Sequence, residues 1–231
     1  MKKYFVIACL ICLTFMTKAQ DFNYISIGYR SSIIPMSNFN DLIDTYNNTR
    51  SFLDNEMEHI WYMHGPAVGW GINFYDYTIG ISWEGKRQVV SSGGTPPGGV
   101  YTTRDLKLRY NQLSFDFMVA IDYYHAVGIS YDLGIMRSLT RTSLDETEDF
   151  TSIEGNRLNS VTLFGHISLN VTSIGGILLK PYVQFPFKEF RFRQTVNTLD
   201  EANSLNYSTA DYEVKPFNFG VTIAWRFYID N

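Results

Sequence analysis

Cysteine is almost absent from this chain of 231 residues, which contains only Cys9 and Cys12. Both lie in an apolar N-terminal segment that we expect to be removed, so the mature chain would have neither a disulfide nor a thiol nucleophile. Their Cys-x-x-Cys spacing suits metal or redox chemistry only if the segment is retained. Lipidation at Cys9, which follows Val6-Ile7-Ala8, is a rival interpretation, but the apolar run before it is short.

Charge and long apolar runs are also scarce. Charged residues make up 18% of the chain, against about a quarter in ordinary soluble domains. The net charge of −4 gives no excess of basic residues for binding phosphate backbones, which argues against a nucleic-acid partner. After the N-terminal segment, no apolar run reaches the ~18 residues that a membrane-spanning helix needs. Three isolated histidines, His59, His64 and His125, form no metal-ligand pattern, and we expect no cofactor.

The N-terminus has the pattern of a targeting signal. Two lysines precede an apolar run over residues 4–16, and Ala19 offers a small-residue cleavage site. We therefore predict a signal peptide over residues 1–19, cleaved after Ala19, and export of residues 20–231 as one domain.

The stretch Lys215–Tyr228 shows the clearest periodicity. Large apolar residues occupy every odd position from Phe217 to Phe227, and small or polar residues occupy the even positions. The alternation lasts about as long as the ~9–11 residues of a strand that crosses a bilayer. Arg226 on the even face would be costly in an apolar core, whereas the polar interior of a membrane barrel accommodates it. The pattern predicts the closing strand of such a barrel.

Seven earlier segments alternate in the same way, at about residues 22–32, 65–75, 77–86, 113–121, 127–135, 161–170 and 177–188. Short connections near Asp76, Tyr123 and Ser173 alternate with long ones at about 33–64, 87–105, 138–157 and 189–215. The sequence therefore predicts an all-β fold, an eight-stranded antiparallel transmembrane β-barrel with short periplasmic turns and long extracellular loops. A soluble barrel of the lipocalin type would place apolar residues inside, so it fits less well.

The long connections differ in character. Residues 38–46 space Phe39, Leu42, Ile43 and Tyr46 as on one face of a helix, with Asn38 as its N-cap. We expect this helix to cover the barrel mouth, with a binding lid as the alternative. Residues 91–99 are rich in Gly and Pro and should be flexible. The third connection is acidic at Asp145, Glu146, Glu148 and Asp149, which suits a solvated loop better than a calcium site.

Six charged residues have inward parity: Arg30, Glu84, Asp116, Asp132, Lys180 and Arg226. Side chains nearly fill an eight-stranded interior, and buried charges must pair. We favour a salt-bridged plug over a narrow ion path. A three-residue turn at 123–125 would place Asp116 directly opposite Asp132, with Lys180, Arg226 and Arg30 as the available cations.

The mature chain resembles the small outer-membrane β-barrel proteins of Gram-negative bacteria, in particular the porin-family or OmpA-like barrels of Bacteroidota. The resemblance rests on the Ala19-Gln20 junction, on Lys180-Pro181-Tyr182 and on the aromatic end Trp225-Arg226-Phe227-Tyr228. It implies an outer-membrane location, contact with membrane lipid and lipopolysaccharide, and a monomer or a subunit of an envelope complex. Loops 33–64 and 189–215 are the candidates for binding other envelope proteins.

One pair of residues invites comparison with an enzyme. His166 and Ser168 lie two positions apart on one face, in a pattern similar to the His-x-Ser-Asn cluster of the outer-membrane lipid A deacylases. Asn170 is displaced by one position from that cluster, and the pair faces inward near a short turn. We therefore expect a structural or interaction protein and no enzyme, with a lipid-modifying enzyme and a small-solute channel as alternatives.

Overall fold

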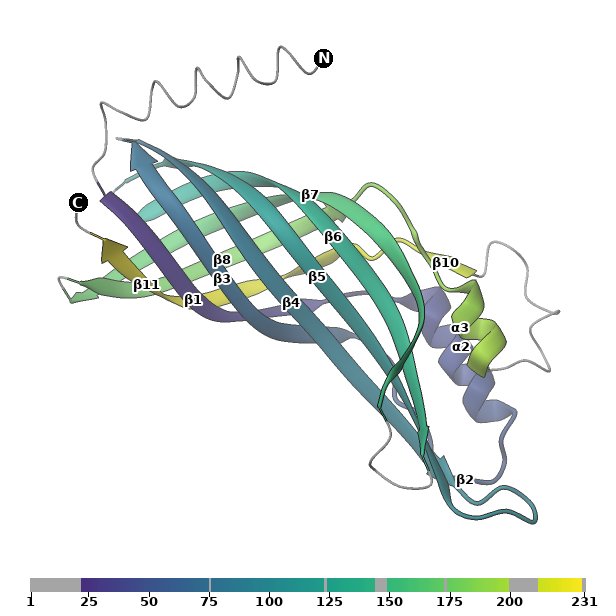
Figure 1. The fold of residues 1–231 in the computed structure, drawn as a ribbon. Coiled ribbons are helices and arrows are strands. Elements are labelled where there is room, and N and C mark those ends of the chain that lie inside the picture. Colours follow the sequence, from purple (N-terminus) through teal and green to yellow (C-terminus); the bar gives the residue numbers. More distant parts are fainter. Residues whose placement is uncertain are drawn as a thin grey trace.

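The computed structural model describes residues 22–74, 76–122, 124–143, 149–172, 174–199 and 212–229, so the predicted signal peptide lies outside the described residues. Eight long strands dominate it (Figure 1). They are β1 (Phe22–Ile33), β3 (Tyr62–Phe74), β4 (Tyr77–Gly94), β5 (Thr102–Ala120), β6 (His125–Ser143), β7 (Thr151–Thr172), β8 (Gly175–Pro186) and β11 (Asn218–Ile229).

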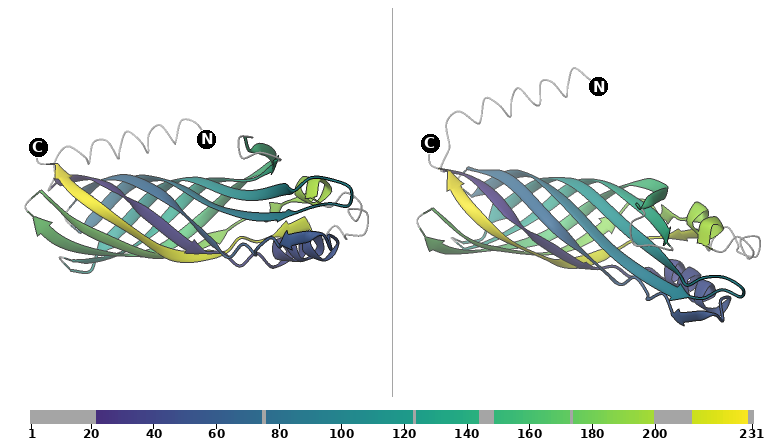
Figure 2. Two further views of the ribbon diagram at one scale, coloured as in Figure 1. Left: turned by 90° about the horizontal axis from the view of Figure 1, so that it is seen from below. Right: turned by 60° about the horizontal axis from the view of Figure 1, so that its bottom comes forward.

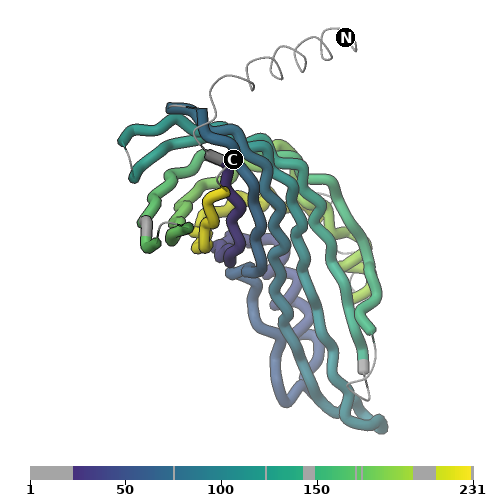
Figure 3. The backbone as a smooth tube through the Cα atoms, turned by 60° about the vertical axis from the view of Figure 1, so that its left-hand side comes forward, coloured from purple at the N-terminus to yellow at the C-terminus, as the bar shows by residue number. Residues whose placement is uncertain are grey.

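These strands form one closed antiparallel barrel. Each pairs with its neighbour along the chain, and β1 pairs with β11 from Asn23↔Ile229 to Ile33↔Phe219. The first strand in purple and the last in yellow accordingly lie side by side in Figure 3. The predicted eight-stranded antiparallel barrel is confirmed.

The strands separate an apolar outer surface from a polar interior. On β11, Phe219, Ile223 and Phe227 are exposed, whereas Thr222 and Arg226 between them are buried. The same alternation occurs on the other strands, as it must where successive side chains point to opposite faces of a sheet. Exposed large apolar residues therefore form a belt around the barrel, which we call the apolar belt.

Strands β4, β5, β6 and β7 continue beyond the apolar belt. The predicted loops at 87–105 and 138–157 are therefore wrong, because much of each range is strand. The β4–β5 ladder runs on without a break from Lys86↔Tyr110 to Gly94↔Thr102, which leaves only 95–101 as a turn. The pattern reverses in this extension, since Val90 and Leu108 point inward and are buried while Arg87 points outward. Strand pairing does not require an apolar outer face, so the lipid-facing pattern covers only part of each of these strands.

A cap closes the end of the barrel opposite the two ends of the described chain (Figure 2). It contains α2 (Ser37–Asn48), β2 (Leu53–Asn55), β9 (Phe190–Arg191), α3 (Arg193–Leu199) and β10 (Glu213–Val214). Its core includes Phe39, whose ring packs against Phe190 and Phe192 with centroids 6.3 and 5.1 Å apart.

The helix predicted in the first connection is confirmed, but the predicted N-cap is wrong. Met36 precedes the first helical residue, and no side chain caps that end. Asn38 instead donates from Nδ2 to the Glu213 carbonyl at 2.8 Å, and Arg50 donates to the Leu199 carbonyl at 2.7 Å. The cap thus joins the segment after β1 to the segment before β11. No helix in the described ranges is long and apolar enough to cross a membrane.

The register between β5 and β6 differs from the prediction. Ala120 pairs with Ala126, so Asp116 lies opposite Ser130 and Asp132 lies opposite Ser114. The turn closes one residue earlier than predicted, where the Ile121 N–H donates to the His125 carbonyl at 2.8 Å. Asp122 Oδ1 accepts the backbone N–H groups of Tyr124 and His125, both at 2.8 Å. Asp122 was expected to pair within the ladder, but its side chain organises the turn. The prediction that Asp116 and Asp132 lie directly opposite each other is therefore wrong.

Candidate functional site

All six charged residues predicted to face inward are buried in the barrel lumen. They come from six strands, β1, β4, β5, β6, β8 and β11. Asp132 is fully buried, and Arg226, among the most accessible of the six, is only 8% exposed. Buried charges need partners, so the contacts of each one decide what the lumen can do.

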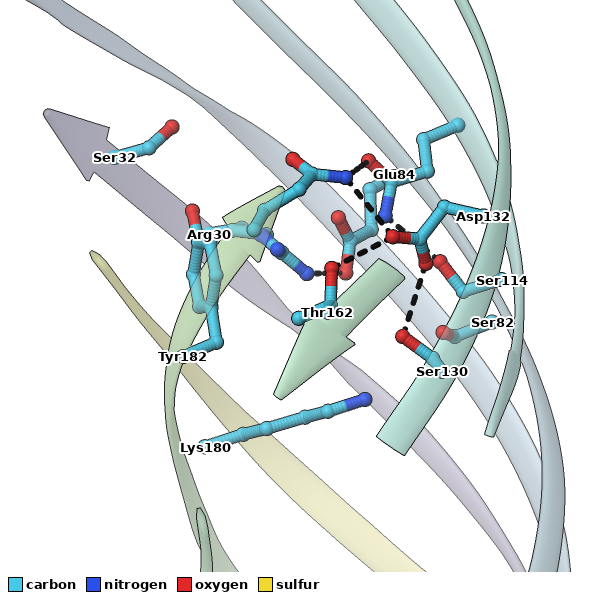
Figure 4. A network of polar contacts seen from close by, with 12 residues as sticks. Arg30, Ser32, Ser82, Glu84, Ser114, Ser130, Asp132, Thr162, Lys180 and Tyr182 are labelled. Atoms are coloured by element: carbon cyan, nitrogen blue, oxygen red, sulfur yellow. Dashed lines mark hydrogen bonds and ion pairs between the residues drawn. The ribbon is translucent and has the colours of Figure 1, made fainter. Parts of the chain in front are cut away.

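The first cluster is an ion pair between Arg30 Nη1 and Glu84 Oε1. The Arg30 guanidinium also lies 3.3 Å from the centroid of the Tyr182 ring, an arrangement visible in Figure 4. Arg30 Nε and Nη2 and Glu84 Oε2 have no hydrogen-bond partner within the described ranges. This pair is therefore held by one direct contact and by the face of an aromatic ring.

The second cluster surrounds Asp132, which has no cation bonded to it among the described residues (Figure 4). Its Oδ1 accepts from Ser130 at 2.9 Å, and its Oδ2 accepts from Ser160, Thr162 and Gln184 at 2.9, 2.6 and 3.0 Å. Several hydrogen bonds to a carboxylate stabilise its charged form without an ion pair. This carboxylate therefore serves as the centre of a polar cluster that joins three strands.

The third cluster pairs Lys180 with Asp116, Nζ to Oδ2 at 2.7 Å. Lys180 Nζ also lies 3.9 Å from the centroid of the Phe164 ring, and Ser82 donates a long bond of 3.4 Å to Asp116. Asp116 Oδ1 and Thr222 Oγ1 have no partner in the described part of the chain. Both residues line a cavity of about 30 Å³, enough for about two water molecules.

Arg226 belongs to a separate cluster near the short turns. Its guanidinium contacts His166 Nε2 at 3.1 Å and donates to Ser168 Oγ at 2.6 Å and to Tyr228 Oη at 3.0 Å. Within the described residues it forms an ion pair with neither aspartate. The residues that we expected to form one network, Asp116, Asp132, Lys180 and Arg226, therefore fall into three groups.

The same cluster contains the pair that resembles a hydrolase dyad. His166 Nε2 lies 2.9 Å from Ser168 Oγ, within the range needed for proton transfer from a nucleophile to a base. Arg226 competes for both atoms, and His166 Nδ1 faces Met118 Sδ at 3.1 Å rather than a carboxylate. The arrangement supports hydrogen bonding between β7 and β11 better than activation of Ser168.

Two lumen residues were missed. Lys86 is fully buried, and its Nζ donates to Asn218 Oδ1 at 3.3 Å and lies 5.0 Å from the Tyr110 ring. It has the same parity as Glu84, so its inward position was predictable, but the predicted strand ended at Lys86. Gln184 bonds to Gln112, Ser160 and Asn218. Its inward parity was visible too, but we considered only charged residues.

No group of histidine, cysteine or acidic residues that could hold a metal occurs in the described part of the chain. Of the acidic residues in the third connection, Asp145, Glu146 and Glu148 lie outside that part.

The sequence matches no protein-family model and no curated protein. Among solved structures, it is similar to Ail, the attachment invasion locus protein of Yersinia pestis, in complex with the heparin analogue sucrose octasulfate. The identity is 13% and the TM-score 0.45, over 89% of this chain and 96% of that chain. The outer membrane protease OmpT from Escherichia coli is 9% identical, with a TM-score of 0.41, over 91% and 97% of the two chains. Similarity at this level assigns no function.

Proposed function

We propose that this protein is an outer-membrane β-barrel with a plugged lumen that has a structural or interaction role through its capped extracellular end. The apolar belt supports the membrane location, because residues such as Ile27 and Ile223 are more than half exposed. Soluble monomers rarely expose a continuous apolar surface of this size. A closed barrel leaves no unpaired strand edge, which lipid requires.

The observation that carries the proposal is that the barrel is filled at two levels. Polar clusters around Glu84, Asp116 and Asp132 occupy the lumen, and the apolar core of the cap lies over its mouth. An eight-stranded barrel has little interior volume beyond its side chains. A path for solutes is therefore disfavoured, and the surface of the cap is the part left for binding.

The narrower expectations from the sequence extend this proposal. They are export by a signal peptide cleaved after Ala19, kinship with porin-family or OmpA-like barrels of Bacteroidota, and contact with outer-membrane lipid and lipopolysaccharide. Other envelope proteins would bind the cap segments within 33–64 and 189–215, with the chain as a monomer or as one subunit of a complex.

Three measurements test the proposal. The purified protein should migrate differently on gels before and after boiling, because a folded barrel resists detergent, and it should fractionate with outer membranes. In planar lipid bilayers it should produce no steady conductance. Recovery as a soluble periplasmic protein would refute the membrane location, and stable ion channels would refute the plug.

A lipid hydrolase is the second candidate, favoured only by the 2.9 Å contact between His166 and Ser168. Lipid A from cells with and without the protein should then differ by an acyl chain in mass spectra. The difference should disappear with Ser168→Ala. Identical spectra would leave the structural or interaction role.

A further inference from the structure

Three arginines stand side by side on the outer surface of the barrel. Arg87 on β4 lies directly opposite Arg109 on β5, and Arg109 lies directly opposite Arg137 on β6. All three side chains are exposed on the outer face, and the residues next to each of them in the chain point toward the interior of the barrel. We call these residues the arginine row.

No acidic residue in the described part of the chain neutralises the arginine row. Among the described residues, none of its members forms an ion pair, and its single side-chain hydrogen bond runs from Arg109 Nε to Asn111 Oδ1 at 3.3 Å. The nearest acidic residue further along β5, Asp105, is paired with Arg141. Like charges directly opposite each other destabilise a sheet, so the row has a cost that an external anion would remove.

A neighbouring lysine responds to this positive charge. Lys107, two residues from Arg109 on β5, has a pKa below its ordinary value, first because it is partly desolvated and then because of Arg87, Arg109 and Arg141. Arg87 and Arg109 are therefore close enough to Lys107 to add to one positive surface on β4 and β5.

The position of the row relative to the apolar belt indicates which anion it meets. Moving out along β4, the exposed residues Tyr77, Ile79 and Trp83 belong to the belt, and Gly85 separates Trp83 from Arg87. Arg87 lies ten positions after Tyr77, which at about 3.4 Å per residue and a tilt of about 40° is a height of about 26 Å. The apolar band of such barrels is about 25 Å tall.

On β4 the arginine row therefore lies just beyond Trp83 on the extracellular side, and of the exposed large apolar residues of that strand only Val89 lies further out. Because the strands are tilted, a row perpendicular to them changes height by about 3 Å per strand, or about 6 Å over the three arginines. That range matches the thickness of one layer of lipid headgroups, roughly 5–7 Å.

We propose that the arginine row binds the phosphate groups of outer-leaflet lipid, with lipid A phosphates as the ligand class. The proposal rests on the outer-membrane location proposed above. Guanidinium groups present paired N–H donors that match phosphate oxygens, and they bind phosphate in fork-like pairs. Three adjacent guanidinium groups at the depth of the lipid headgroups suit a ligand with more than one phosphate.

The test uses the full mature chain folded into lipid vesicles. Vesicles of phosphatidylcholine are compared with vesicles that also contain diphosphoryl lipid A, and the temperature at which the folded gel band disappears is measured. We expect lipid A to raise this temperature for the wild-type protein. The rise should be lost in the triple variant Arg87→Gln, Arg109→Gln, Arg137→Gln.

A matched variant removes the same charge from another part of the extracellular end, by Lys188→Gln, Arg193→Gln and Lys215→Gln. These three residues are also exposed, and they lie at or between the ends of β8 and β11. This variant should keep the response to lipid A. An equal loss in both variants, or an undiminished rise in the arginine-row variant, overturns the proposal.

Two further arms separate the possible failures. If soluble heparin protects the wild type through the arginine row while lipid A does not, the ligand is a soluble polyanion and the lipid assignment is wrong. If the protein never inserts into phosphatidylcholine vesicles, the membrane location itself fails. Insertion without any response to lipid A refutes only the arginine-row proposal.

Discussion

Replacing Lys180 by methionine should destabilise the barrel strongly, because it removes the cation from a buried pair. Lys180 and Asp116 side chains are 10% and 9% exposed, and their contact is 2.7 Å. Without Lys180, Asp116 would keep only the 3.4 Å bond from Ser82, since its Oδ1 has no partner among the described residues. Breaking a buried pair in this way costs about 3–5 kcal/mol.

The assay is equilibrium unfolding in urea of the protein inserted in lipid vesicles, followed by tryptophan fluorescence. Asp116→Asn added to Lys180→Met should recover much of the loss, because the double variant has no unpaired charge at this site. We expect a coupling energy of about 1–3 kcal/mol between the two changes. Asp116→Asn with Arg226→Met should be additive within about 0.5 kcal/mol, since Arg226 bonds to His166, Ser168 and Tyr228 instead.

Two results would refute this reasoning. Unchanged stability of Lys180→Met would show that water solvates Asp116, which would favour a water-filled path over a plug. Strong coupling between Asp116 and Arg226 would show that the lumen clusters form one network in solution.

Three further predictions concern the capped end of the barrel. Phe39→Ala should destabilise the cap by about 3–5 kcal/mol, because the ring is fully buried against Phe190 and Phe192. Faster hydrogen exchange should then appear in the cap and not in the barrel ladder; exchange that accelerates everywhere would contradict a separate cap core. Proteinase K added outside vesicles should cut first within 95–101 and spare the paired residues 87–94, and first cuts in 87–94 would mean that the hairpin extension is not formed. Burial raises the pKa of Glu154 above its ordinary value, so its contribution to stability is complete below the ordinary glutamate pKa and is lost as pH rises through the folded-state pKa. Glu154→Gln should flatten this part of the thermal stability–pH curve, and an unchanged slope would assign the effect to another group.

The sequence was sufficient for the number of strands and for the face on which each residue lies. Alternation decides whether a side chain points in or out, so the inward positions of Arg30, Glu84 and Lys180 followed from parity alone. Parity does not determine height along the barrel, because height depends on the register between strands. The register of β5 and β6 depended on one side chain, Asp122, which closes the turn instead of joining the ladder.

Which lumen side chains contact each other was less predictable, because these contacts also depend on the register between strands. Asp132 is satisfied by three hydroxyl groups and Gln184, so the search for a cation beside it was misdirected. The extended hairpins were missed because their outer face is polar. Their inner face, with Val90 and Leu108, has the apolar pattern of a soluble sheet. The two faces of these strands exchange polarity along their length, so a single alternation pattern cannot predict their full extent.

The cap has a consequence for how the barrel can open sideways. β1 and β11 meet where the two ends of the described chain come together, and no covalent connection joins this pair of strands at either end. The cap segments that follow β1 and precede β11 are bonded to each other, from Asn38 to the Glu213 carbonyl and from Arg50 to the Leu199 carbonyl. Separating β1 from β11 at the capped end therefore also requires breaking the cap core. The cap thus holds together the two strands that no hairpin connects, so their separation should begin at the end of the barrel opposite the cap.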